Sequence, residues 1–63
     1  MKEEIRLKSK AITFAMLGND LSHLGLFDKA IEQFSEAIRV DPGDFRFYGN
    51  RSYCYDKLGL YEE

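Results

Sequence analysis

The chain has 63 residues, with nine basic and eleven acidic side chains, so its formal charge is −2 at pH 7. Surfaces that bind nucleic-acid phosphates are usually strongly basic, and this balance argues against one. A single cysteine, Cys54, excludes an internal disulfide and is typical of a reducing compartment. We therefore expect a cytoplasmic location, and a nuclear location is the alternative. No apolar run approaches the ~20 residues that span a membrane, and the first residues, Met-Lys-Glu-Glu, are not typical of a signal peptide.

Apolar residues at helical spacing predict a first helix over residues 3–24. The middle of this helix is apolar on nearly every side, which is typical of a helix that packs against more than one neighbour. Taken alone, the pair Gly18-Asn19 would favour a turn inside this stretch. Gly25 is a better end point, because glycine readily takes the left-handed conformation that often follows a helix.

A second helix is expected from Asp28, whose negative charge suits the start of a helix. Its apolar residues recur on one face and predict a single buried stripe: Ala30, Ile31, Phe34, Ala37 and Ile38. Residues 41–44 (Asp-Pro-Gly-Asp) end it, because proline cannot continue a helix. Asp44 can then cap a third helix over about residues 45–58. No segment alternates with period two, so we expect no strand.

The sequence nearly copies itself at an interval of 34 residues. Residues 24–28 (Leu-Gly-Leu-Phe-Asp) return as residues 58–62 (Leu-Gly-Leu-Tyr-Glu). At the same interval three residues of the first helix, Phe14, Gly18 and Leu21, return as Tyr48, Ser52 and Tyr55. A repeat of 34 residues with an aromatic, Leu-Gly, Ala-x3-Phe and Pro in this order is the tetratricopeptide pattern. Residues 11–63 therefore resemble the tetratricopeptide repeat family.

This resemblance implies an all-α fold: one helix–turn–helix unit plus the first helix of a second repeat, which is a truncated α-solenoid. We expect an N-terminal helical extension over residues 1–10, a first repeat over 11–44 and a partial second repeat over 45–63. In this family the glycine at position 18 is the small residue where the second helix lies close. The first helix should therefore run through Gly18.

The resemblance also implies a protein–protein interaction module of the adaptor or co-chaperone kind. In this family the first helices of the repeats line a concave groove that takes extended peptides. The residues of this chain that match groove positions, and are our candidate peptide-binding residues, are Asn19, His23, Arg46, Asn50, Tyr53 and Lys57.

Asn19 and Asn50 match two asparagines with which some family members hold the terminal carboxylate of acidic chaperone tails. This chain departs from their pattern at Ala15, where those members carry a lysine. Charge-assisted bonds supply much of such binding. A chaperone tail is therefore a candidate partner of a longer parent protein, and these 63 residues alone should bind it weakly.

A second hypothesis is a structural module that oligomerises through its third helix. No helix follows to cover that helix, and exposed apolar surface of this kind marks an interface. The isolated fragment would then be a homo-oligomer, joined through four residues: Phe47, Tyr55, Leu58 and Tyr61.

No catalytic residue, metal site or cofactor is predicted. His23 has no second His or Cys at ligand spacing. Cys54 lies between two tyrosines, and the sequence indicates no general base to activate it. We therefore expect it to be a small buried residue. Because no nucleophile–base pair or phosphate loop is present, we expect no enzyme.

Overall fold

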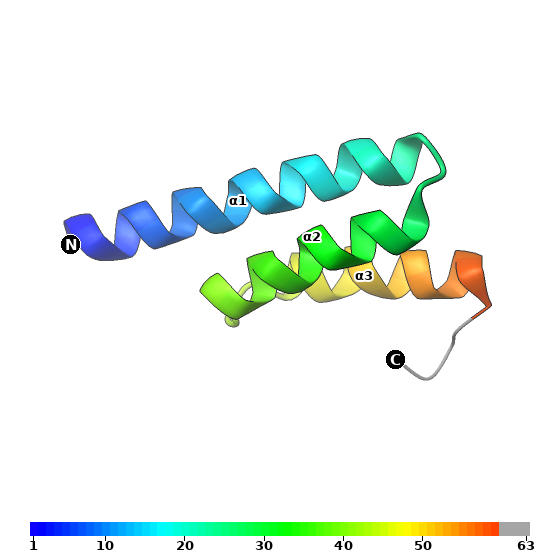
Figure 1. Ribbon diagram of the computed structural model, residues 1–63. Helices are drawn as coiled ribbons and strands as arrows, with labels where there is room; N and C mark the ends of the chain where they lie inside the picture. Colours follow the sequence, from blue (N-terminus) through cyan, green and yellow to red (C-terminus); the bar gives the residue numbers. More distant parts are fainter. Residues whose placement is uncertain (60–63) are drawn as a thin grey trace.

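Three helices make up residues 1–59, which are the residues that the structure, a computed structural model, describes (Figure 1). α1 spans Lys2–His23, α2 spans Phe27–Val40 and α3 spans Phe45–Leu58. The described residues contain no strand, so the expected all-α fold is confirmed: a helical hairpin followed by one further helix, a truncated α-solenoid. Within this part of the chain, no helix combines the length and the apolar character needed to cross a membrane.

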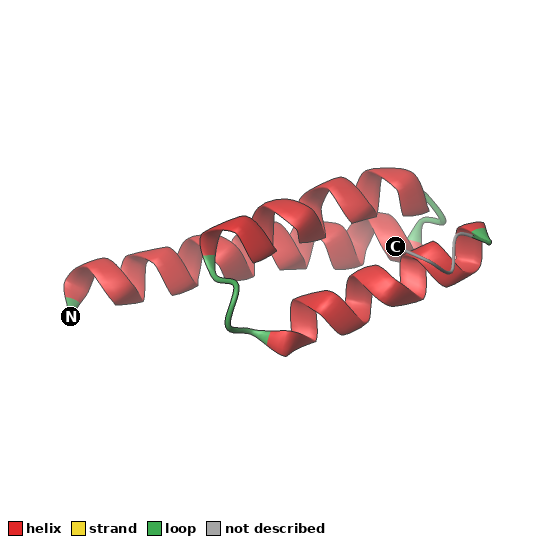
Figure 2. Cartoon of the chain, turned by 90° about the horizontal axis from the view of Figure 1, so that it is seen from below, coloured by secondary structure: helices red, strands yellow, loops and turns green. Residues whose placement is uncertain are grey.

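The middle helix, α2, holds the other two in place. Consecutive helices run in opposite directions, and the first turns of α1 extend beyond the end of α2 (Figure 1). α2 packs along both α1 and α3, whereas α1 and α3 barely touch each other (Figures 1 and 2). The position of α1 relative to α3 is therefore set by what each of them contacts on α2.

The first helix runs through Gly18, as expected, and ends at His23. Gly25 follows with a φ of 81°, in the left-handed region where glycine has little steric penalty. The N–H of Gly25 donates to the carbonyl of Ser22 at 3.0 Å, and the N–H of Leu26 donates to the carbonyl of Leu21 at 2.9 Å. This is the Schellman pattern that satisfies the last carbonyls of a helix.

The other helix boundaries agree with the sequence to within one residue. α2 begins at Phe27 rather than Asp28. The Asp28 carboxylate lies in its first turn and accepts a hydrogen bond from the N–H of Lys29 at 2.8 Å. The third helix begins at Phe45, and the Asp44 carboxylate caps it by accepting the N–H of Arg46 at 3.1 Å.

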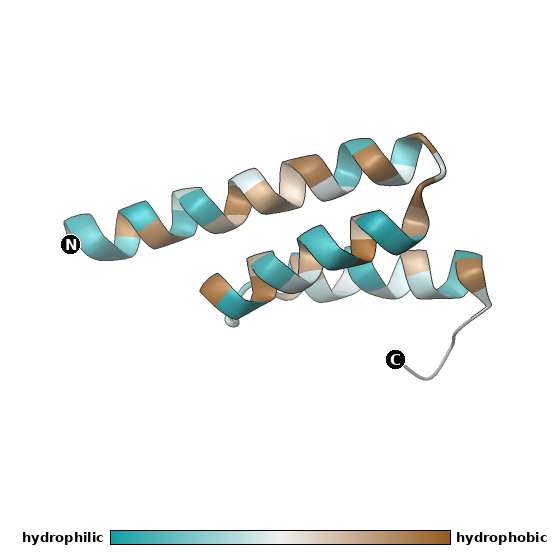
Figure 3. Cartoon of the chain, in the orientation of Figure 1, coloured by the Kyte–Doolittle hydropathy of each residue, from teal (hydrophilic) through white to brown (hydrophobic). Residues whose placement is uncertain are grey.

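The core lies between α2 and the two helices that it contacts. The expected stripe of α2 is present, with Ala30, Phe34 and Ala37 buried and the two isoleucines partly buried against them. Figure 3 shows how apolar residues recur along the helices. The other buried side chains come from the helices on either side: Ala11, Ala15, Phe47 and Cys54. Alanines on α1 suit a helix that α2 approaches closely, since they add little bulk at the contact.

The side chain of Arg51 connects α3 to α2. Its Nη1 donates to Ser35 Oγ on α2 at 3.0 Å. Its guanidinium also lies 5.7 Å from the ring centroid of Tyr48 and 5.9 Å from that of Tyr55. A cation within about 6 Å of an aromatic face is attracted to it. The two rings therefore hold the guanidinium where it can reach Ser35.

Replacing Phe34 by Ala should unfold the chain. Phe34 is fully buried and is the largest such side chain. Truncating a buried Phe costs about 3–5 kcal/mol, while a domain of this size has about 3–9 kcal/mol in total. Thermal unfolding followed by circular dichroism checks this. A cooperative transition within a few degrees of the unaltered chain would show that Phe34 does not hold the core.

Gly18→Ala and Gly49→Ala should change stability in opposite directions. A Cβ on Gly18 would lie 2.8 Å from Cε1 of Phe34, whereas a Cβ on Gly49 would meet nothing within 4 Å. Both changes gain up to about 1 kcal/mol of helix propensity, but overpacking at Gly18 costs about 1–3 kcal/mol. Urea unfolding should show a less stable Gly18 variant and a more stable Gly49 variant. Equal stabilisation of both would contradict the close approach of Phe34.

Candidate functional site

Two adjoining hollows form a groove between α1 and α3. The first, which we call the amide hollow, has a volume of about 230 Å³ and is lined by Asn19, Ser22, His23, Phe34, Asn50 and Tyr53. The second, the apolar hollow, has a volume of about 260 Å³ and is lined by Ile12, Ala15, Met16, Asn19, Arg46, Phe47 and Asn50. Asn19 and Asn50 line both hollows, so the two lie next to each other, and we call them together the groove.

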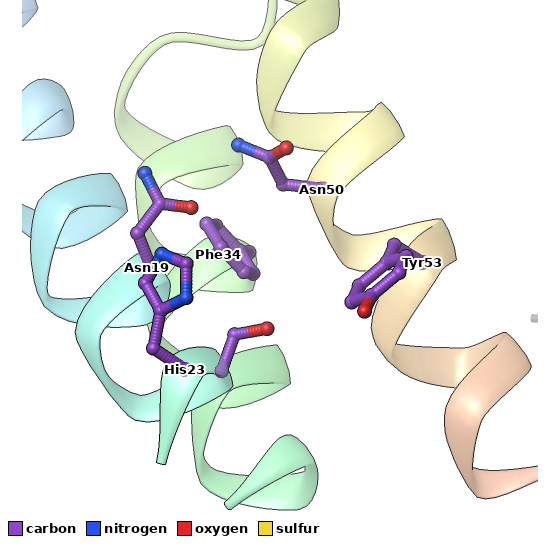
Figure 4. Close-up of a pocket in the computed structure, with 6 residues that line it drawn as sticks. Asn19, His23, Phe34, Asn50 and Tyr53 are labelled. Atoms are coloured by element: carbon purple, nitrogen blue, oxygen red, sulfur yellow. The ribbon is translucent and has the colours of Figure 1, made fainter. Parts of the chain in front are cut away.

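The two asparagines border the groove from opposite sides. Figure 4 shows Asn19 on α1 and Asn50 on α3 with their amides directed into the space between the helices, and the Phe34 ring of α2 behind them. Within residues 1–59, neither amide side chain is hydrogen-bonded to another part of the chain. Each amide offers two donors and a carbonyl acceptor, so both remain able to bind a ligand.

An ion pair compensates the charge of Arg46. Its Nε donates to Asp44 Oδ1 at 2.9 Å, and its Nη2 donates to Asp44 Oδ2. These hydrogen bonds from the Arg46 side chain are the main reason why the pKa of Asp44 falls to about 2. The same pairing raises the pKa of Arg46 above its ordinary value. The carboxylate therefore stays ionised at neutral pH and offsets the charge of Arg46, the one cationic side chain among residues 1–59 that lines the hollows.

An aromatic side chain, Tyr53, forms part of the wall of the amide hollow. The Tyr53 ring packs edge-on against Phe27 with ring centroids 6.3 Å apart, and Tyr53 itself borders the hollow (Figure 4). Lys57 Nζ lies 5.4 Å from the Tyr53 ring centroid, and Lys57 lines neither hollow. A ligand in the groove would therefore meet the phenol ring before the ammonium group.

The structure brings most of the expected peptide-binding residues together. Five of the six line the groove: Asn19, His23, Arg46, Asn50 and Tyr53. The sixth, Lys57, lies beside Tyr53. Their role in binding stays a prediction. Three residues of the groove lining were not expected from the sequence: Met16, Phe34 and Phe47.

The expected self-association surface needs a correction at Phe47. This residue is only 2% exposed and belongs to the chain's own core, so it is not available to a second copy. Tyr55 is half-buried beside Arg51, and Leu58 is exposed. Tyr61 lies outside the described residues. Of the four expected residues, only Leu58 is an exposed apolar side chain in residues 1–59.

Cys54 is fully buried, as expected. Its Sγ donates to Ser22 Oγ at 3.8 Å, which links α3 to α1 behind the amide hollow. Residues 1–59 contain no group of three or more His, Cys, Asp or Glu side chains placed to hold a metal ion. The absence of an enzymatic activity stays a prediction.

Comparison with known proteins gives one family and several relatives. A family model described as tetratricopeptide repeat matches residues 11–44. An Hsp70-Hsp90 organizing protein of Triticum aestivum is 44% identical over 46 residues, which cover 73% of this chain and 8% of that protein. Hsp70-Hsp90 organizing protein 3 of Arabidopsis thaliana is 41% identical over 46 residues, which again cover 73% of this chain and 8% of that protein. Outer dynein arm-docking complex subunit 4 of Danio rerio is 38% identical over 52 residues, which are 82% of this chain and 11% of that protein.

No solved structure gives a significant match. The chain spans about a tenth or less of the length of the relatives named above. The matched family model nevertheless covers more than half of the chain, including all of α2 and the part of α1 that starts at residue 11. The chain belongs to the tetratricopeptide repeat family.

Proposed function

We propose that this chain is a protein-interaction module that holds an extended peptide segment in the groove between α1 and α3. One observation carries the proposal: Asn19 and Asn50 direct unpaired amides into the same groove from two different helices. An extended peptide has backbone N–H and C=O groups free along both edges. A side-chain amide matches both, because it donates and accepts at once.

Two amides cannot supply the whole binding energy. A hydrogen bond contributes only about 0.5–1.5 kcal/mol net, while association costs about 4 kcal/mol or more. The amides are therefore better suited to fix the path of the peptide backbone than to provide affinity. Affinity must come from peptide side chains that fill the two hollows or from further repeats of a longer protein.

The relatives suggest one kind of partner. Several of them are named as organizing proteins for the chaperones Hsp70 and Hsp90. A chaperone segment, such as an acidic C-terminal tail, is therefore a candidate ligand of a longer protein that contains this chain. The adaptor role, and a cytoplasmic location that would allow it, remain part of this proposal.

Selection of peptides from a random heptapeptide library displayed on phage tests the proposed site. Peptides that bind the unaltered chain should bind the double variant Asn19→Ala/Asn50→Ala more weakly by about 1–3 kcal/mol, because the backbone loses two hydrogen bonds to the amides. Gln33→Ala is the matched control, since it removes an amide from α2 that lines neither hollow. Enriched peptides that bind the double variant equally well, or a library without any enrichment, would contradict the proposal.

An acidic hexapeptide with a free terminal carboxylate should bind the unaltered chain weakly. Ala15 stands in the wall of the apolar hollow, and Arg46 is already paired with Asp44. Ala15→Lys should bind the hexapeptide several times more tightly and with a stronger dependence on salt, because the added attraction is electrostatic. A lysine at this position can lay its stem along the wall and reach the groove with its ammonium group.

Thr13→Lys is the control for this second test, because it adds the same charge at an exposed position that lines neither hollow. Titration calorimetry at two salt concentrations measures the effect. Low-micromolar binding of the hexapeptide to the unaltered chain, lost when its terminal carboxylate is amidated, would show that the two asparagines hold a carboxylate without a lysine.

A further inference from the structure

We propose that the groove selects an uncharged peptide segment and places one aliphatic side chain of that segment in the apolar hollow, beside Asn19 and Asn50. This inference rests on the proposed function, because it names the class of ligand for the same groove. It also separates this chain from a binder of acidic tails.

The apolar hollow exposes aliphatic surface on a helix face that meets water. Ile12 is 42% exposed and Met16 is 61% exposed, and both line the hollow. They stand one helical turn apart on α1, so their side chains are neighbours on its surface. Ala15 and the buried Phe47 complete the apolar wall. A ligand side chain that covered Ile12 and Met16 would remove this apolar surface from water.

The size of the hollow suits one side chain. Its volume is about 260 Å³, and an apolar cavity of roughly 150 Å³ already accepts a benzene ring. Asn19 and Asn50 line both this hollow and the amide hollow. A peptide backbone held by the two amides can therefore direct an adjacent side chain into the apolar hollow.

The charges around the groove favour an uncharged segment. Among residues 1–59, Arg46 is the one charged residue that lines the apolar hollow, and both its Nε and its Nη2 already donate to Asp44. An acidic side chain would meet the Asp44 carboxylate beside that guanidinium, and the Asp44 charge offsets the attraction of Arg46. A basic side chain would find Asp44 already paired. Either charge would lose water for little net attraction from the ion pair, and burying a charge without such compensation is unfavourable.

The peptides selected on the unaltered chain test this inference directly. They should share one position at which Leu, Ile, Val or Met is enriched, and they should carry no excess of Asp or Glu. A selected peptide with Ser at that position should bind about tenfold more weakly, because burial of an aliphatic side chain contributes an amount of this order. This comparison needs no change in the protein.

The matched variants are Ile12→Ser/Met16→Ser and Leu24→Ser. All three residues are exposed, so these variants should fold, and Leu24 lines neither hollow. The selected peptide and its Ser counterpart should bind the double variant equally, whereas on Leu24→Ser the preference of about tenfold should remain. Fluorescence anisotropy of the labelled peptides measures both affinities.

Each other outcome overturns the inference. Peptides that depend on Asn19 and Asn50 but are acidic, or have no aliphatic position, would leave the proposed function standing and contradict the ligand class. A preference for the aliphatic peptide that survives in the double variant would place its side chain elsewhere. If sedimentation shows a dimer of the unaltered chain that the double variant abolishes, a second copy rather than a peptide covers the apolar hollow.

Discussion

The contact between the Phe34 ring and Gly18 is the constraint on which the rest of this structure depends. A single added Cβ at Gly18 would lie 2.8 Å from the ring, so α1 can approach α2 this closely only because that position has no side chain. Phe34 is the largest fully buried side chain in residues 1–59. The contact fixes the distance between α1 and α2 at the middle of the hairpin.

The same part of α2 also fixes α3. Ser35, the neighbour of Phe34, accepts the hydrogen bond from Arg51. Asn19 directly follows Gly18 and Asn50 directly precedes Arg51. Two consecutive residues of α2 thus anchor the positions next to the two asparagines. This explains how helices that barely touch each other can hold a pair of amides in one groove.

Much of the fold could be predicted from the sequence because the repeat shows which positions are equivalent. The helical spacing of apolar residues identified the helices and the buried stripe of α2, and the repeat showed that α1 continues through Gly18. Helix boundaries differed by one residue, which is an ordinary uncertainty where a helix end depends on local capping.

Phe47 shows where the repeat is a poor guide. Its equivalent one repeat earlier is Thr13, an exposed residue of α1. In residues 1–59 no further helix packs on that side of α1, whereas α2 packs on the corresponding side of α3 and buries Phe47. Equivalent positions in the two copies therefore have different neighbours, and the sequence of one copy does not show this difference.

The groove could be predicted only in part, for a related reason. The repeat pattern indicated which residues face it, but contacts between side chains decide its chemistry. Asp44 offsets the charge of Arg46, and Phe47 of α3 lines the same hollow as Met16 of α1. Both depend on side-chain positions that helical periodicity does not specify. Both support the uncharged ligand segment that we propose for this groove.

The most direct test of this account is a map of amide chemical shifts in the ¹⁵N-labelled chain as a selected heptapeptide is added. The account predicts that the largest changes fall on residues 12–23 of α1 and 46–53 of α3, which line the two hollows. Changes concentrated instead on the outer face of α2, at Lys29, Glu32 and Glu36, would contradict it, because the ligand would then bind outside the groove.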